Sequence, residues 1–218
     1  MSNKAIVLLS GGLDSAVTLY FAKHKGFDCH CLAFDYGQRH YRELEAACKI
    51  ARIAKSPLTI SKISLPWGGS ALLDKKIKLP SSKPQVPSRI PSTYVPGRNI
   101  IFLSFALSFA EATKAGAIFI GAHAQDYSGY PDCRPEFYNA LGKAFSIGTK
   151  AGVQHKKIAI KTPIINKTKA EIIRLGDKLG VPFELTWSCY QGGEKPCGKC
   201  DSCYFRNKGF REAGIEQK

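Results

Sequence analysis

A short polar stretch near the start of the chain, Ser-Gly-Gly-Leu-Asp-Ser at residues 10–15, carries residue types that bind nucleotide phosphates. It follows an apolar run at residues 5–9 and opens an amphipathic run at residues 16–22, the order of a strand, a glycine turn and a helix. Adjacent glycines let the backbone approach a ligand closely, and the unpaired first amides of a helix attract anions. Because Asp14 would repel a bare phosphate, we expect Mg²⁺ between its carboxylate and the phosphates. The stretch predicts a nucleotide-phosphate loop; a serine-capped structural turn is the alternative.

A second stretch suited to chemistry, residues 122–134, is dense in His, Asp, Tyr and Arg. Asp132 could accept N–H groups from the guanine-like edge of a heterocycle, and Tyr127 or Tyr130 could stack on its face. Arg134 could pair with a carboxylate or phosphate through two hydrogen bonds. The alternative is an ordinary loop that caps the next helix.

Four of the eight cysteines gather near the end of the chain, at Cys189, Cys197, Cys200 and Cys203. In a reducing compartment such a cluster indicates metal ligation and not disulfides. Four thiolates at this spacing can surround one tetrahedral zinc ion and leave no open position, so we expect a structural site. An iron–sulfur cluster uses similar ligands and is the main alternative.

The elements that position these residues alternate between strands and helices. Apolar or alternating runs predict strands over residues 5–9, 28–34, 58–65, 117–121 and 157–163. This alternation implies an α/β fold with parallel strands and right-handed crossovers, in which ligands bind at the carboxyl ends of the strands. The predicted strand over residues 28–34 is followed by Asp35, Tyr36 and Gln38. These side chains either face the nucleotide or form a solvated turn.

Further polar residues lie at helix starts. Arg98 and Asn99 open a predicted helix over residues 100–115, where anions are favoured. Lys169 belongs to a capping-box pattern that begins at Thr168. Lys161 and Lys169 are candidates for binding phosphate, and a solvated lysine is the alternative for each.

Residues 66–96 hold six of the twelve prolines and little periodicity. Since the pattern after them continues the same sheet, we expect a mobile flap over the active site and not a domain linker. The predicted organisation is one domain over residues 1–185, with a small zinc-binding element at residues 186–218 packed on it.

Charge and hydropathy narrow the possible functions. The chain of 218 residues has a net charge of +15, but its basic residues are spread out, with no arginine-rich tract. A basic surface around an anionic small substrate is therefore favoured over nucleic-acid binding. The sequence shows neither a run of eighteen apolar residues nor a signal-peptide pattern, so we expect a cytoplasmic protein without membrane association.

Five motifs, taken in order, closely resemble the 7-cyano-7-deazaguanine synthase (QueC) family of the PP-loop N-type ATP pyrophosphatases. They are SGGLDS at 10–15, PSTYVPGRN at 91–99, DYSGYPDCR at 126–134, KTPI at 161–164 and the four-cysteine tail. The third motif is the discriminating one, because other PP-loop enzymes share the first. The resemblance implies a Rossmann-like (adenine nucleotide alpha hydrolase-like) parallel sheet flanked by helices.

The resemblance also implies a reaction. A C–N ligase of this family converts 7-carboxy-7-deazaguanine, ammonia and ATP into the nitrile preQ0, through an adenylated acid and an adenylated amide, on the route to queuosine. It implies a homodimer with ATP, Mg²⁺ and one structural zinc. The implied ATP-binding residues are Leu8, Leu9, Ser10, Gly11, Gly12, Leu13, Asp14, Ser15, Ala16, Val17 and Thr18. Candidate catalytic residues are Asp14, Ser15, Arg98 and Lys169; candidate substrate-binding residues are Asp126, Tyr130, Asp132 and Arg134; the zinc ligands are Cys189, Cys197, Cys200 and Cys203.

Two other functions remain open at this point. A PP-loop tRNA thiolase or lysidine-type ligase would use the positive charge, but such enzymes generally need an added RNA-binding region. A non-catalytic module that binds ATP, zinc and RNA is the other possibility, and it would release no pyrophosphate.

Overall fold

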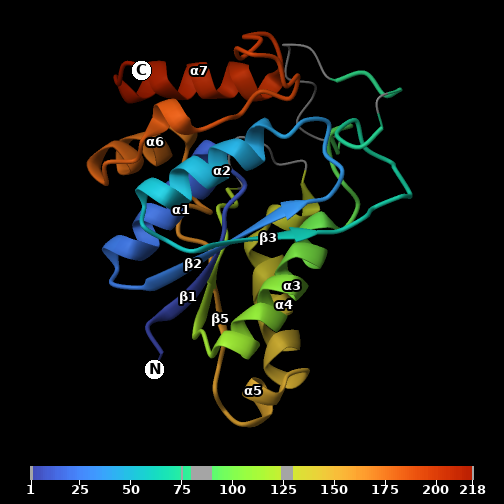
Figure 1. The fold of residues 1–218 in the computed structure, drawn as a ribbon, viewed down its shortest axis with the longest axis vertical. Helices are drawn as coiled ribbons and strands as arrows, with labels where there is room; N and C mark the ends of the chain where they lie inside the picture. Colours follow the sequence, from blue (N-terminus) through green and yellow to red (C-terminus); the bar gives the residue numbers. More distant parts are fainter. Residues whose placement is uncertain (1, 75, 80–89, 124–129, 218) are drawn as a thin grey trace.

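The computed structural model describes residues 2–74, 76–79, 90–123 and 130–217. Its centre is a five-stranded sheet with the order β3-β2-β1-β4-β5, in which every neighbouring pair is parallel (Figure 1). The strands are β1 (Lys4–Leu8), β2 (Asp28–Asp35), β3 (Leu58–Lys62), β4 (Ala117–Phe119) and β5 (Ala159–Lys161). The predicted parallel α/β sheet is confirmed, although β3, β4 and β5 are shorter than their apolar runs suggested.

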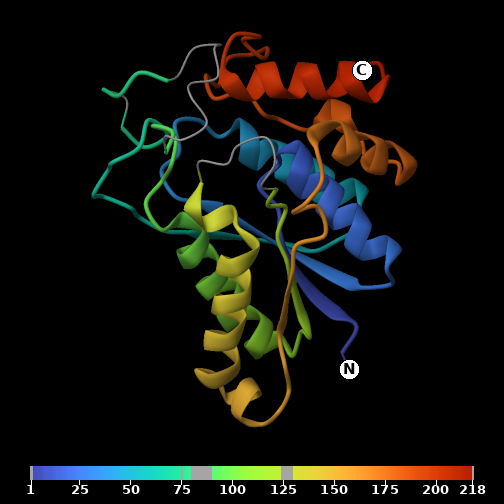
Figure 2. The same ribbon diagram turned by 180° about the vertical axis from the view of Figure 1, so that it is seen from behind.

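Helices cover both faces of the sheet because its central strands β1, β2 and β4 are largely buried on both sides. Along β1, Ala5 and Val7 join a buried cluster with α1, α2 and α6, whereas Ile6 and Leu8 join a second cluster with α3 and α4. Figure 2 shows the second face, where α3 and α4 run side by side. The helices are α1 (Leu13–His24), α2 (Arg42–Ile53), α3 (Arg98–Thr113), α4 (Pro135–Ile147), α5 (Lys150–Val153), α6 (Lys169–Lys178) and α7 (Asp201–Ala213), with short 3₁₀ turns η1 (Pro131–Cys133) and η2 (Phe183–Leu185).

The end of the chain packs on the first face. Helix α7 lies against α6, and the Phe210 ring meets the Phe183 ring edge-on with centroids 5.3 Å apart (Figure 1). The capping box that starts α6 is present: the Thr168 side chain accepts from the Glu171 amide, and the Glu171 carboxylate accepts from the Thr168 amide. This box places Lys169 as the first residue of α6.

The proline-rich segment is only partly described, since residues 75 and 80–89 lie outside the described residues. Around that gap the chain packs on the body: Ser70 and Ala71 are buried, and the Ala71 amide donates to the Ser92 carbonyl. The predicted flap over the site stays a prediction. Among the described residues, every helix is too short or too polar to cross a membrane.

Candidate active site

A cavity of about 370 Å³ opens at the carboxyl ends of the strands, a size suited to a small-molecule ligand. Its wall is built from segments far apart in the sequence. These are the end of β1 with residues 10 and 12–15, residues after β2 and β4, and the first residues of α2, α3, α6 and α7. The loops after parallel strands meet at one edge, which is where the strand pattern predicted a ligand.

The loop at residues 10–15, called the PP-loop below, is held by its two serines. The Ser10 amide donates to Ser15 Oγ (3.2 Å), the Gly12 amide donates to Ser10 Oγ (3.3 Å), and Ser15 Oγ donates to the Gly12 carbonyl (2.9 Å). Helix α1 begins at Leu13, and its first turn borders the cavity. The predicted strand, glycine turn and helix are therefore in place, with a helix start aimed at the cavity.

Gly11 brings the PP-loop close to α2. Its φ is +87°, and an ideal Cβ there would lie 2.0 Å from the Glu43 carbonyl oxygen and 2.8 Å from the Ala47 amide nitrogen. Only glycine fits both the left-handed backbone and this distance. Gly11 therefore holds the loop against the first turn of α2 and does not itself line the cavity.

Asp14 lies in the cavity within a small polar network. Lys169 Nζ donates to both carboxylate oxygens (2.7 and 2.8 Å) and lies 3.0 Å from His123 Nε2, which is 3.4 Å from Asp14 Oδ2. Burial raises the pKa of Asp14, but the charges and hydrogen bonds of Lys169 and His123 outweigh it, so the pKa falls well below its usual value. Asp14 is thus an ionised carboxylate at any physiological pH, and Lys169 is brought to the PP-loop from 155 residues away.

A second cluster surrounds Arg98 at the start of α3. Burial opposes the charge of Arg98, but Tyr36, Tyr130 and Asp132 favour it, and together they raise its pKa above the usual value. Burial also raises the pKa of Tyr36 and of Tyr130. Arg98 is therefore a permanent cation on the wall of the cavity, and none of the ion pairs among the described residues includes it. Such a guanidinium can bind a substrate anion.

Glu43, in the first turn of α2, also borders the cavity. Burial raises its pKa to about 7, although Arg98 acts in the opposite direction. A carboxyl group with this pKa exchanges its proton near neutral pH, so it has the property expected of an acid–base residue.

Some of the remaining predicted residues line the cavity and others lie behind it or outside it. Tyr130 lines the cavity, and so do Leu8, Leu9 and Leu13. Residues 16–18 are fully buried within α1 and face the core, so they support the PP-loop from behind. Tyr36 and Gln38 line the cavity, whereas Asp35 is outside its lining.

The residues expected to bind the heterocycle are placed differently. Asp132 is buried, and its carboxylate accepts from the Asn99 amide (3.3 Å) while its carbonyl accepts from the Tyr138 hydroxyl (3.0 Å). It thereby anchors the start of α3 and is not in the cavity lining. Arg134 is exposed at the start of α4, also away from the lining. Asp126 lies outside the described residues.

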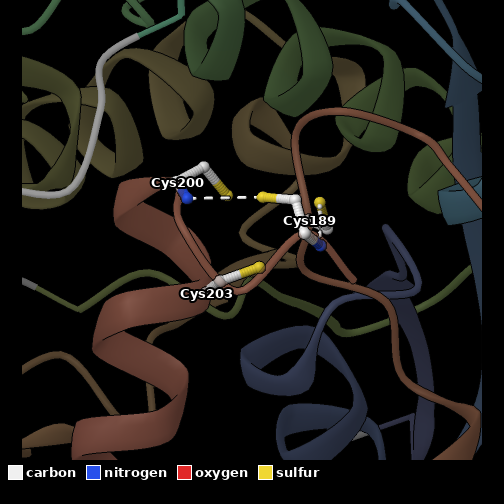
Figure 3. A group of neighbouring side chains, drawn as sticks. Cys189, Cys200 and Cys203 are labelled. Carbon is white, nitrogen blue, oxygen red and sulfur yellow. Dashed lines mark hydrogen bonds between the residues drawn. The ribbon is translucent and has the colours of Figure 1, made fainter. Parts of the chain in front are cut away.

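The four predicted cysteine ligands come together. Their sulfur atoms all lie within 4.8 Å of one another, and Figure 3 shows the side chains of Cys189, Cys200 and Cys203 pointing toward a common centre. Tetrahedral Zn–S bonds of about 2.3 Å place the sulfurs roughly 3.8 Å apart, so the cluster fits one metal ion. The amides of Gln191 and Cys197 point at Cys189 Sγ (3.4 and 3.3 Å), an arrangement that stabilises a thiolate.

The cysteine cluster adjoins the active site. Helix α7 starts directly after Cys200, and its residues Asp201, Ser202 and Arg206 line the cavity together with Ser188 and Tyr190. Arg206 is buried and donates to Thr186 Oγ1 (2.7 Å) and to the Phe183 carbonyl (2.9 Å). A metal held by the four thiols would therefore also hold one wall of the cavity.

Sequence reasoning did not select His123, Glu43 or Arg206. His123 follows a predicted strand directly, so its position was a usable signal. Glu43 and Arg206 look like ordinary charged residues on amphipathic helices, and only the packing of α2 and α7 turns them toward the cavity.

Comparison with known proteins assigns the chain to a family. The family model described as "Queuosine biosynthesis protein QueC" matches residues 4–214. A protein named 7-cyano-7-deazaguanine synthase from Trichodesmium erythraeum is 53% identical, and the alignment covers 97% of this chain and 97% of the relative. A protein of the same name from Thermoplasma acidophilum is 52% identical, and that alignment covers 98% of this chain and 90% of the relative.

The fold comparison is consistent at a coarser level. An NMN synthetase structure from Francisella tularensis has a TM-score of 0.52 at 15% identity, covering 100% of this chain and 89% of that one, which supports the fold alone. With a family model over almost the whole chain and relatives above 50% identity, this protein belongs to the QueC family of queuosine biosynthesis proteins.

Proposed function

We propose that this protein is an ATP-dependent 7-cyano-7-deazaguanine synthase, which converts 7-carboxy-7-deazaguanine and ammonia to the nitrile. The observation that carries the proposal is the cavity, where the PP-loop, Arg98, Tyr130 and Lys169 meet although they come from distant motifs. Relatives that share more than half of the sequence bear the name of this activity.

The chemistry follows from the poor leaving ability of a carboxylate oxygen. Transfer of AMP to that oxygen makes it leave, and attack by ammonia then gives the amide. Adenylation of the amide oxygen and loss of AMP give the nitrile, so one site serves two dehydrations. Each adenylation releases pyrophosphate, whose charge needs fixed donors and cations.

The residues around the PP-loop suit that demand. The amides at the start of α1 and the Lys169 ammonium lie on the same side of the cavity, where they would bind the β and γ phosphates. Arg98 would bind the substrate carboxylate or the α phosphate, and Ser15 would keep the loop in shape through its bond to the Gly12 carbonyl.

Two metals belong to the proposal. Asp14 is the carboxylate that would hold Mg²⁺, and its depressed pKa suits that role, since one carboxylate with water ligands is typical of magnesium sites. Magnesium would neutralise part of the negative charge of the pyrophosphate. Zinc would be held by the four cysteines in a closed, structural site.

Recognition of the heterocycle falls to Tyr130 among the described residues, since its side chain borders the cavity and can stack on a flat ring. Asp132 would contribute indirectly, by anchoring Asn99 and with it the start of α3. A direct contact from Asp126 to the substrate, a homodimer and a cytoplasmic location complete the proposal.

The test is a mass-spectrometric assay with ATP, Mg²⁺, ammonium and 7-carboxy-7-deazaguanine. Formation of the nitrile with AMP and pyrophosphate is the expected result. The Asp14→Ala variant should form no product while keeping its fold and its bound metal. Binding of ATP without any conversion of the deazapurine acid would overturn the proposal.

A further inference from the structure

Glu43 is fixed beside the PP-loop by packing on both sides. Its neighbours Leu44 and Ala47 point into the core of the first face, and its backbone carbonyl meets Gly11 at the contact described above. Glu43 therefore lines the cavity from a helix turn that packs closely on the phosphate loop.

Glu43 differs from the other carboxylates near the cavity. Asp14 is bound by Lys169, Asp132 accepts from the Asn99 amide, and Asp201 also has a partner. Within the described part of the chain, the Glu43 carboxylate has neither a hydrogen bond nor an ion pair closer than 4.0 Å. A half-buried acceptor of this kind costs free energy unless a ligand pairs with it.

The side chains around Glu43 determine which kind of ligand its carboxylate can bind. Tyr36 at the end of β2, Tyr190 next to Cys189 and Arg98 in α3 line the same cavity as Glu43. The charge of Arg98 acts to lower the pKa of Glu43. Tyrosine oxygens and a carboxylate are acceptors for a small cation with several N–H groups. The fixed positive charge of Arg98 repels a divalent ion at Glu43 about twice as strongly as it repels a singly charged one.

We propose that Glu43 binds ammonium and is the catalytic base that releases ammonia from it for attack on the adenylated acid. The inference rests on the proposed function, in which ammonia is the second substrate. A carboxylate poised near neutrality is a better acceptor for an ammonium proton than one with an ordinary pKa.

One proton passes from ammonium to the Glu43 carboxylate, and the freed lone pair forms the C–N bond to the acyl carbon. The C–O bond to AMP breaks and its electron pair leaves with the AMP phosphate, which also takes the second proton of the attacking nitrogen. Glu43 then returns its proton to water before the next turnover.

The experiment separates adenylation from amide formation. Labelled pyrophosphate is exchanged into ATP with 7-carboxy-7-deazaguanine and Mg²⁺ but no ammonium, and amide plus nitrile formation is then followed against ammonium concentration. Glu43→Gln should keep the exchange rate within about twofold, raise KM for ammonium at least about tenfold and lower kcat about 100-fold. Glu45→Gln, on the exposed side of the same helix, is the matched control and should match the wild type in both assays.

Glu43→Asp guards against a folding defect, since it keeps the charge and should recover part of the ammonium response. The inference is overturned if Glu43→Gln shows an unchanged ammonium dependence, or if exchange is lost together with product formation. If the wild-type protein itself shows no acid-dependent exchange, the proposed function fails, an outcome distinct from a failure of the role of Glu43.

Discussion

Replacing Gly11 by alanine tests whether the PP-loop is clamped against α2. The φ of +87° costs an L-residue about 1–2 kcal/mol. The new Cβ would also lie 2.0 Å from the Glu43 carbonyl oxygen, a backbone atom that no side-chain rotation can move away. Overpacking of this kind costs about 1–3 kcal/mol more. We therefore expect Gly11→Ala to lower the free energy of unfolding by about 2–5 kcal/mol.

Gly37→Ala is the matched control, because Gly37 has a φ of +79° but nothing within 4 Å of the position of its Cβ. Its free energy of unfolding should fall only by the cost of the left-handed backbone conformation, about 1–2 kcal/mol. Urea denaturation of both variants, with unchanged m values, gives the difference directly. Equal destabilisation of the two variants would refute the clamp. Gly11→Ala should also raise KM for ATP, because the loop must shift away from α2 to make room.

The remaining predictions concern charge and metal. Lys169→Met should lower kcat for AMP formation about 100-fold or more, measured by pyrophosphate release, while Lys161→Met, at an exposed position outside the cavity, should not. Cys200→Ser should lose bound metal by elemental analysis and lower Tm; a metal-free variant as stable as the wild type would contradict the structural role. Because burial raises the pKa of Glu43 to about 7, the folded protein binds an extra proton between roughly pH 4.5 and 7, and stability from this group is lost as pH rises through that range. Glu43→Gln should therefore match the wild type at pH 4 and exceed it at pH 8 by at most about 3 kcal/mol in denaturant titrations, with no such difference for Glu45→Gln.

The sheet and the phosphate loop were predictable because local pattern decides them. Apolar runs separated by amphipathic runs determine parallel strands, and the capping box at Thr168 specifies a helix start to the residue. The strand lengths were not predictable, since β4 and β5 end where pairing ends and not where apolar character ends.

The site was predictable in part, and the difference lies in how far each contact reaches along the chain. The cysteine ligands are close in sequence, so their spacing sufficed. The pairing of Lys169 with Asp14 spans 155 residues and depends on how α6 docks on α1. The residue type of Asp132 suggested an acceptor for the N–H groups of the substrate. In the structure η1 lies at the start of α3, so the Asp132 carboxylate accepts from the backbone amide of Asn99 and does not reach the cavity.

One wall of the cavity is formed by residues 188–206, which follow the rest of the site in the sequence, and this order has a consequence for biosynthesis. A nascent chain that has emerged as far as α6 already holds the sheet, the PP-loop and Lys169, but it lacks Ser188, Tyr190 and the first turn of α7. The cavity is thus completed only when the segment that follows α6 packs against the sheet and its helices. A metal bound by the four thiols would favour that packing, so metal supply during synthesis would affect how many new molecules form a complete cavity. The turnover of each complete molecule would still depend on the residues of the cavity itself.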